Sequence, residues 1–143
     1  MNNPKTNLLV LRLILTFYTV AFLLGFVLAV LPWQMLSDFL FYWGGNMGDP
    51  MSDSEMSRFV VRQTFVTLGF LGILFAILAV NPLKYGLILP IIAYGLILYG
   101  FFYLILAIGL YGLWMYWVDV LLCIGGGALL YVFQKRARET NFA

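Results

Sequence analysis

"RLILTFYTVAFLLGFVLAVLPW", residues 12–33, decides the fold class, because it is an apolar run long enough to cross a lipid bilayer. Crossing about 30 Å of hydrocarbon takes roughly 20 apolar residues in a helix. The run is too long for the core of a signal peptide, and it lacks an A-x-A cleavage pattern. We therefore expect this segment to be retained as a membrane span.

Three further segments have the same character. The chain of 143 residues is 64% hydrophobic and 10% charged, which is too few polar residues to cover the surface of a water-soluble domain. The sequence predicts an all-α integral membrane protein, a four-helix bundle that forms a single domain over residues 1–143. The predicted spans are residues 8–31, 63–80, 87–108 and 114–133.

The distribution of basic residues predicts the orientation. With a cytoplasmic amino terminus, six basic residues fall on the inner side and only Arg58 and Arg62 on the outer side, in agreement with the positive-inside rule. Both termini are then cytoplasmic, and we expect the protein in a bacterial cytoplasmic membrane. The six inner residues are Lys5, Arg12, Lys84, Lys135, Arg136 and Arg138.

The long outer connection, residues 32–62, contains a second kind of helix. Apolar residues from Trp33 to Trp43 recur at helical spacing over too short a length to span, so we predict a short helix lying in the interface. Tryptophan favours the headgroup level, which makes Trp33, Trp43, Trp114 and Trp117 the predicted interfacial anchors. Beyond this helix, Ser52 and Glu55 have the spacing of a capping box and predict a helix start near residue 53.

Small residues predict where the helices meet. In lipid, helices associate where small side chains let the backbones approach each other. Such residues form a stripe in the second span, and a run of three glycines occurs in the fourth. The predicted packing residues are Gly69, Gly72, Ala76 and Gly126.

Two charged residues, Arg62 and Asp119, lie on these small-residue faces. Asp119, in "MYWVDVLLC", is about 7 Å below the outer surface if the fourth helix starts near Trp114, and Arg62 falls at a similar level. A lone charge there costs about 2 to 3 kcal/mol and persists when paired. We predict an Arg62–Asp119 ion pair that joins the second and fourth spans. The alternatives are a proton or ligand role for Asp119, and contact with lipid headgroups or water.

The sequence contains no histidine and a single cysteine, Cys123. Histidine-ligated haem, the usual zinc and copper sites and histidine-based catalysis are thereby excluded, so we predict no metal site, no catalytic residue and no enzyme activity. No cofactor is expected through side-chain ligands. Tyr94, Tyr99 and Tyr103 in the third span could line a groove for a quinone or lipid, although aromatic residues at this density more often serve packing.

Three stretches carry a resemblance to a known group of proteins. "DSEMSRFVVRQTFVTLGFLGILFAILAVNP" (53–82), the turn "NPLKYG" (81–86) and the ending "YVFQKRAR" (131–138) resemble the small four-helix membrane proteins of the DoxX and BphX-like group. The DoxX resemblance implies association with a quinol-oxidising membrane complex. The third span departs from the pattern, because "AYGLILYGFFYLI" (93–105) is uncharged where BphX-like relatives commonly carry a charge. This departure weakens the case for a ligand at that helix.

Two classes of function follow. The first is a non-catalytic accessory or structural subunit of a larger membrane complex, such as a respiratory or other energy-converting assembly. The second is a small homo-oligomeric transporter, or a quinone- or lipid-binding protein, that uses Asp119. The expected partners are membrane lipids and other membrane subunits, and no nucleic acid is expected.

Overall fold

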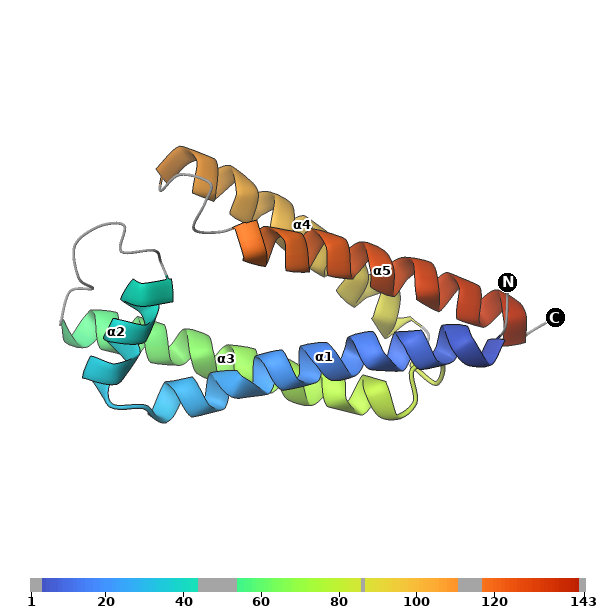
Figure 1. The fold of residues 1–143 in the computed structure, drawn as a ribbon, viewed down its shortest axis with the longest axis horizontal. Coiled ribbons are helices and arrows are strands. Elements are labelled where there is room, and N and C mark those ends of the chain that lie inside the picture. The colour runs from blue at the N-terminus through green and yellow to red at the C-terminus, as the bar shows by residue number, and fades with distance from the viewer. Residues whose placement is uncertain (1–3, 44–53, 86, 111–116, 142–143) are drawn as a thin grey trace. The chain divides into compact units, whose positions relative to one another are not determined.

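A computed structural model describes residues 4–43, 54–85, 87–110 and 117–141, which form five α-helices and no strand (Figure 1). Four of these helices are long and apolar enough to cross a membrane. The all-helical class is therefore confirmed, as is the expectation of four helices with the length and composition of membrane spans. The helices are α1 (Pro4–Val30), α2 (Trp33–Trp43), α3 (Glu55–Val80), α4 (Ile88–Leu110) and α5 (Trp117–Asn141).

All four long helices extend beyond the predicted spans at one end, and α3 and α5 extend furthest. Helix α3 begins at Glu55, close to the helix start predicted near residue 53 and ahead of the predicted span 63–80, and α5 continues past residue 133 to Asn141. The extension of α5 contains lysine and arginine, which are good helix formers, and it places Arg138 in the last turn, where a cation stabilises the helix dipole. The predicted first residues of the fourth span, 114–116, lie outside the described residues.

The start of α3 corrects the predicted capping box. The backbone N–H of Ser57 donates to Ser54 Oγ at 3.1 Å, and the two hydroxyl oxygens are 2.8 Å apart. Ser54 is thus the N-cap residue and Glu55 the first residue of the helix, whereas the predicted box needed Glu55 in the third position. Ser52 lies outside the described residues.

The helices are distributed over two units, and α1 and α3 each contribute to both. We call residues 17–75 the α1–α3 unit, and residues 1–16 together with 76–143 the α4–α5 unit. In the α1–α3 unit, the rings of Tyr18, Phe22 and Phe75 stack at centroid distances of 5.2 to 5.8 Å, and Phe75 is almost completely buried. This aromatic stack joins α1 to α3.

Glycines set the separation of α1 and α3 within that unit. A Cβ on Gly25 would come to 2.5 Å from the carbonyl oxygen of Phe65, and one on Gly72 would come to 2.7 Å from the backbone nitrogen of Leu23. Both neighbours are backbone atoms, so no side chain could move aside. The two helices therefore approach more closely than any larger residue would permit.

The α4–α5 unit is built on an antiparallel hairpin, with α4 and α5 side by side (Figure 1). A Cβ on Gly100 of α4 would meet Ile124 at 2.6 Å, and one on Gly127 of α5 would meet the carbonyl oxygen of Ala93 at 2.7 Å. Leu89, Ala93 and Leu130 are fully buried. The hairpin is thus packed through one glycine from each helix.

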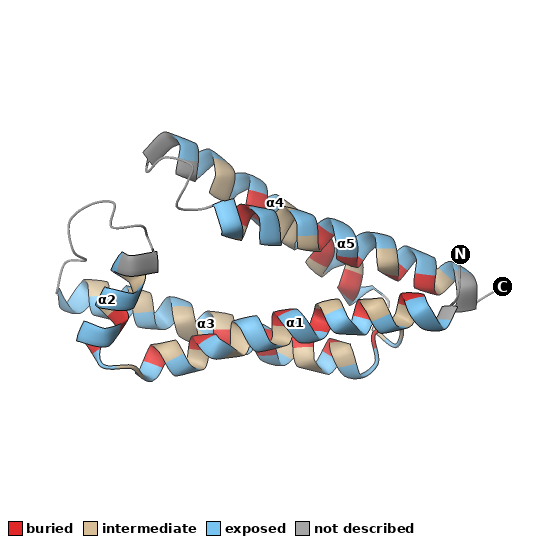
Figure 2. Ribbon diagram, in the orientation of Figure 1, coloured by how far each residue is buried: buried red, intermediate tan, exposed pale blue. Residues whose placement is uncertain are grey.

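Exposed positions, pale blue in Figure 2, recur along all four long helices. Many of them carry large apolar side chains. No more than 22% of the apolar window of any candidate span is buried. A water-soluble protein of this size would expose a much more polar surface. The exposed apolar surface is consistent with contact between the helices and membrane lipid.

Candidate functional site

Arg62 lies where α1 ends. Its Nη2 atom donates a hydrogen bond of 3.3 Å to the carbonyl oxygen of Leu31, the residue after the last turn of α1. The final carbonyl groups of a helix have no partner within the helix and carry partial negative charge. Helix α1 has no basic residue of its own in its last turn, so Arg62 of α3 supplies the missing cation.

The neighbouring arginine of α3 contacts α2. The guanidinium carbon of Arg58 lies 5.9 Å from the ring centroid of Trp33, which is a cation–π distance. Among the side chains of α2 that the structure describes, Trp33 and Leu36 are buried, while Phe39 and Phe41 are exposed. The two arginines of α3 therefore contact the connection between α1 and α2, Arg62 at Leu31 and Arg58 at Trp33.

The α4–α5 unit contains the reciprocal contact. Arg12 of α1 donates from Nη2 to the carbonyl oxygen of Val80, the last residue of α3, at 3.4 Å. Helix α3 also lacks a basic residue in its own last turn. Each of these two helices thus receives at its carboxyl end an arginine from the other.

Asp119 lies in the first turn of α5 and is half-buried. The first N–H groups of a helix have no internal partners and favour a negative charge. Helix α5 is described from Trp117 onward, so the predicted start near Trp114 lies outside the described residues. Arg62 belongs to the α1–α3 unit and Asp119 to the α4–α5 unit, so the Arg62–Asp119 ion pair stays a prediction.

A small polar cluster surrounds Asp119 within the hairpin. Cys123 follows one turn later on the same face of α5, and the hydroxyl group of Tyr99 on α4 is within electrostatic reach of both side chains. Cys123 is half-buried, whereas Tyr99 is 56% exposed. We call Tyr99, Asp119 and Cys123 the Asp119 cluster. A carboxylate beside a phenol and a thiol in a span could bind a cation or the polar end of an apolar molecule.

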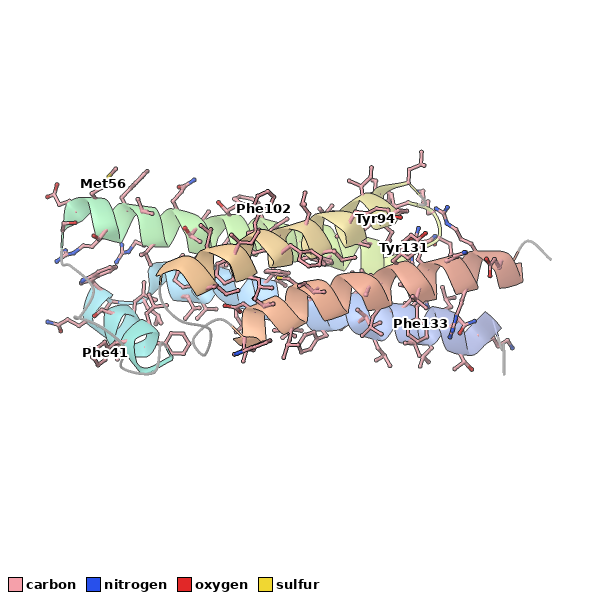
Figure 3. All side chains as sticks on the ribbon, turned by 90° about the horizontal axis from the view of Figure 1, so that it is seen from above. Phe41, Met56, Tyr94, Phe102, Tyr131 and Phe133 are labelled. Atoms are coloured by element: carbon pink, nitrogen blue, oxygen red, sulfur yellow. The ribbon has the colours of Figure 1, made fainter. Side chains whose placement is uncertain are left out.

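The three tyrosines predicted to line a groove are divided between two places. Tyr99 and Tyr103 stack with centroids 5.6 Å apart and ring planes at 17°. Tyr94 instead lies beside Tyr131 of α5, with centroids 5.3 Å apart (Figure 3). Tyr131 was missed in the sequence, where its only signal was a position near the carboxyl end of the fourth span. On α4, Gly95 lies between Tyr94 of one pair and Tyr99 of the other.

The predicted packing residues occupy different environments. Gly69 faces the ring of Phe26, where an added Cβ would come to 2.6 Å, and Gly72 contacts the backbone of α1. Ala76 and Gly126 are half-buried, and Gly127, which follows Gly126, contacts the backbone of α4.

The predicted anchors also differ from one another. Trp33 is buried and Trp117 is 43% exposed. Trp43 is the last residue of α2, but its side chain, like the whole of Trp114, lies outside the described residues.

Comparisons with known proteins give no relative. No protein-family model matches the chain, and neither a curated protein nor a solved structure matches it. Among the described residues, no group of three or more cysteine, aspartate or glutamate side chains is placed to hold a metal ion. The site therefore has to be interpreted from its own residues.

Proposed function

We propose that this protein is a non-catalytic accessory subunit of a larger membrane assembly, and that an exposed face of α4 contacts a neighbouring subunit. The observation that carries the proposal is a row of four exposed residues that recur at helical spacing along α4. They are Ile91, Gly95, Leu98 and Phe102. We call this row the α4 face.

Gly95 is the informative member of the α4 face. A Cβ on Gly95 would have nothing within 4 Å, so the glycine is not required by the packing described for this chain. A glycine costs a helix about 1 kcal/mol relative to alanine. Contact with lipid chains does not offset this loss of helix stability. A second helix does offset it, because its backbone can pack closely against a glycine. The exposed aromatic ring of Phe102 is of the kind enriched in the cores of protein interfaces.

The resemblance to DoxX and BphX-like proteins supports a respiratory or other energy-converting assembly in a bacterial cytoplasmic membrane. In that setting the subunit needs no cofactor of its own. It would contribute helix surface to an assembly whose other members carry the redox groups.

The proposal is tested by purifying the tagged protein from its native membrane in mild detergent. Gly95→Leu should lower the recovery of partner subunits about tenfold, because a larger side chain at a packed position costs about 1 to 3 kcal/mol. Ala128→Leu is the matched control, since Ala128 on α5 is exposed and lies outside the α4 face. Equal recovery of partner subunits with both variants would show that the α4 face does not contact a neighbouring subunit.

The Asp119 cluster favours a second candidate, a small homo-oligomeric carrier in which Asp119 binds the transported cation or proton. An acidic residue within a span often marks such a path. In liposomes that contain only this protein, Asp119→Asn would then abolish a flux that the wild-type protein supports. A stable homo-oligomer without other subunits would accompany that result.

A further inference from the structure

A surface hollow of about 420 Å³ lies at the end of the α4–α5 unit where α4 begins and α5 ends. Its volume is within the range of about 300 to 1,000 Å³ typical of small-molecule sites. The residues that line it are Leu83, Lys84, Tyr85, Leu87, Ile88 and Arg138. We propose that this hollow binds the headgroup of an anionic phospholipid.

Two cations from segments far apart in the sequence meet in the hollow. Lys84 comes from the turn between α3 and α4, and Arg138 comes from the last turn of α5. None of the described residues that line the hollow is acidic. A phosphate group bound in the hollow would accept charge-assisted hydrogen bonds from both basic side chains.

The turn that carries Lys84 is structurally defined. The backbone N–H of Lys84 donates to the carbonyl oxygen of Asn81 at 3.2 Å, with Pro82 buried between them. Lys84 Nζ also lies 5.8 Å from the ring centroid of Tyr85. The ammonium group is therefore held near the hollow before any ligand binds, which lowers the entropy cost of binding.

The apolar part of the lining favours a lipid over a soluble anion. Leu87 is 82% exposed and Ile88 is 40% exposed, at the point where the candidate span Ile88–Leu106 begins. The cations thus lie at the boundary of the span, and apolar side chains adjoin them on the side of the hydrocarbon. Basic pockets between helices at this depth are typical binding sites for acidic lipid headgroups.

The test uses the full-length protein in neutral detergent with added phosphatidylglycerol, and native mass spectrometry measures the fraction of protein that retains lipid. The double variant Lys84→Gln with Arg138→Gln should weaken retention about 30-fold, which corresponds to about 1 kcal/mol for each basic residue. The matched control, Lys135→Gln with Arg136→Gln, removes two exposed charges from the same end of α5 outside the hollow. It should weaken retention less than about threefold, and Lys84→Arg should retain the lipid.

Three results would overturn the proposal. If the hollow variant and the control lost the same amount of lipid retention, the basic residues at this end would attract lipid by their charge alone and the hollow would not be a specific site. Equal retention of phosphatidylcholine and phosphatidylglycerol would show that charge does not select the ligand. Displacement of the lipid by inorganic phosphate would show that the hollow takes a free anion. If the double variant does not fold, Lys84→Gln alone should still weaken retention about fivefold, and an unchanged value would contradict the site.

Discussion

Arg62 Nη2 lies 3.3 Å from the carbonyl oxygen of Leu31 and donates a hydrogen bond to it. Arg12 Nη2 makes the corresponding bond of 3.4 Å to Val80 at the end of α3. In both cases a cation carried by one helix satisfies a carbonyl group at the carboxyl end of another. The contact gives Arg62 a structural role that does not require Asp119.

A double-mutant cycle tests whether Asp119 also acts on Arg62. Arg62→Gln, Asp119→Asn and the double variant are compared by their free energies of unfolding in detergent. We expect a coupling energy of about 1 kcal/mol or more, because either single substitution strands a charge inside the membrane while the double substitution strands none. A coupling energy of zero would show that Arg62 acts through Leu31 alone.

Gly25→Ala should destabilise the protein by about 1 to 3 kcal/mol, because the added Cβ would lie 2.5 Å from the backbone oxygen of Phe65 and would push α1 away from α3. Gly125→Ala is the control. It adds the same methyl group where nothing lies within 4 Å and should be neutral or stabilising. The measurement is again the free energy of unfolding, and similar effects at the two positions would contradict close glycine packing between α1 and α3.

Ser54→Ala should lower stability by about 1 kcal/mol, because the Ser57 N–H loses its acceptor at the start of α3. Ser52→Ala should have no measurable effect on the same unfolding curve. If the Ser52 substitution proved the costlier of the two, the capping box predicted from the sequence would be correct and the Ser54 cap would not.

Cysteine labelling tests the predicted orientation. Because Cys123 is the single cysteine, Cys123→Ala provides a background into which Asp38→Cys or Lys84→Cys is introduced. With both termini cytoplasmic, a membrane-impermeant maleimide added to intact cells should label the cysteine at position 38 and not the one at position 84. The reverse pattern would invert the orientation.

The bounds of α2 could be predicted from the sequence, whereas the contact of Gly127 with α4 could not. Apolar and aromatic spacing after Pro32 predicts a helix from Trp33 to Trp43, and the structure has the same bounds. Gly126 and Gly127 differ by one residue, which is about 100° around the helix. The choice between them depends on Ala93 and Ile97 of α4, which are remote in the sequence.

The partner of Arg62 shows a second limit. The positive charge of Arg62 predicts an acidic partner, and acidic side chains can be identified in a sequence. The acceptor in the structure is a backbone carbonyl at Leu31, and every residue carries such a group. Only the folded path of the chain shows which carbonyl is exposed at a helix end beside the arginine.

The central claim is that this chain works as a subunit of a larger membrane assembly. The most direct test is the intact mass of the complex that purifies with the tagged protein. The tagged protein is extracted from its native membrane in mild detergent and analysed by native mass spectrometry. The account predicts a complex in which other polypeptides are present in fixed stoichiometry, with this chain lost from the complex when Gly95 is replaced by leucine. A mass equal to the chain alone would contradict the account. A mass equal to two or more copies of the chain would contradict it and favour the homo-oligomeric carrier.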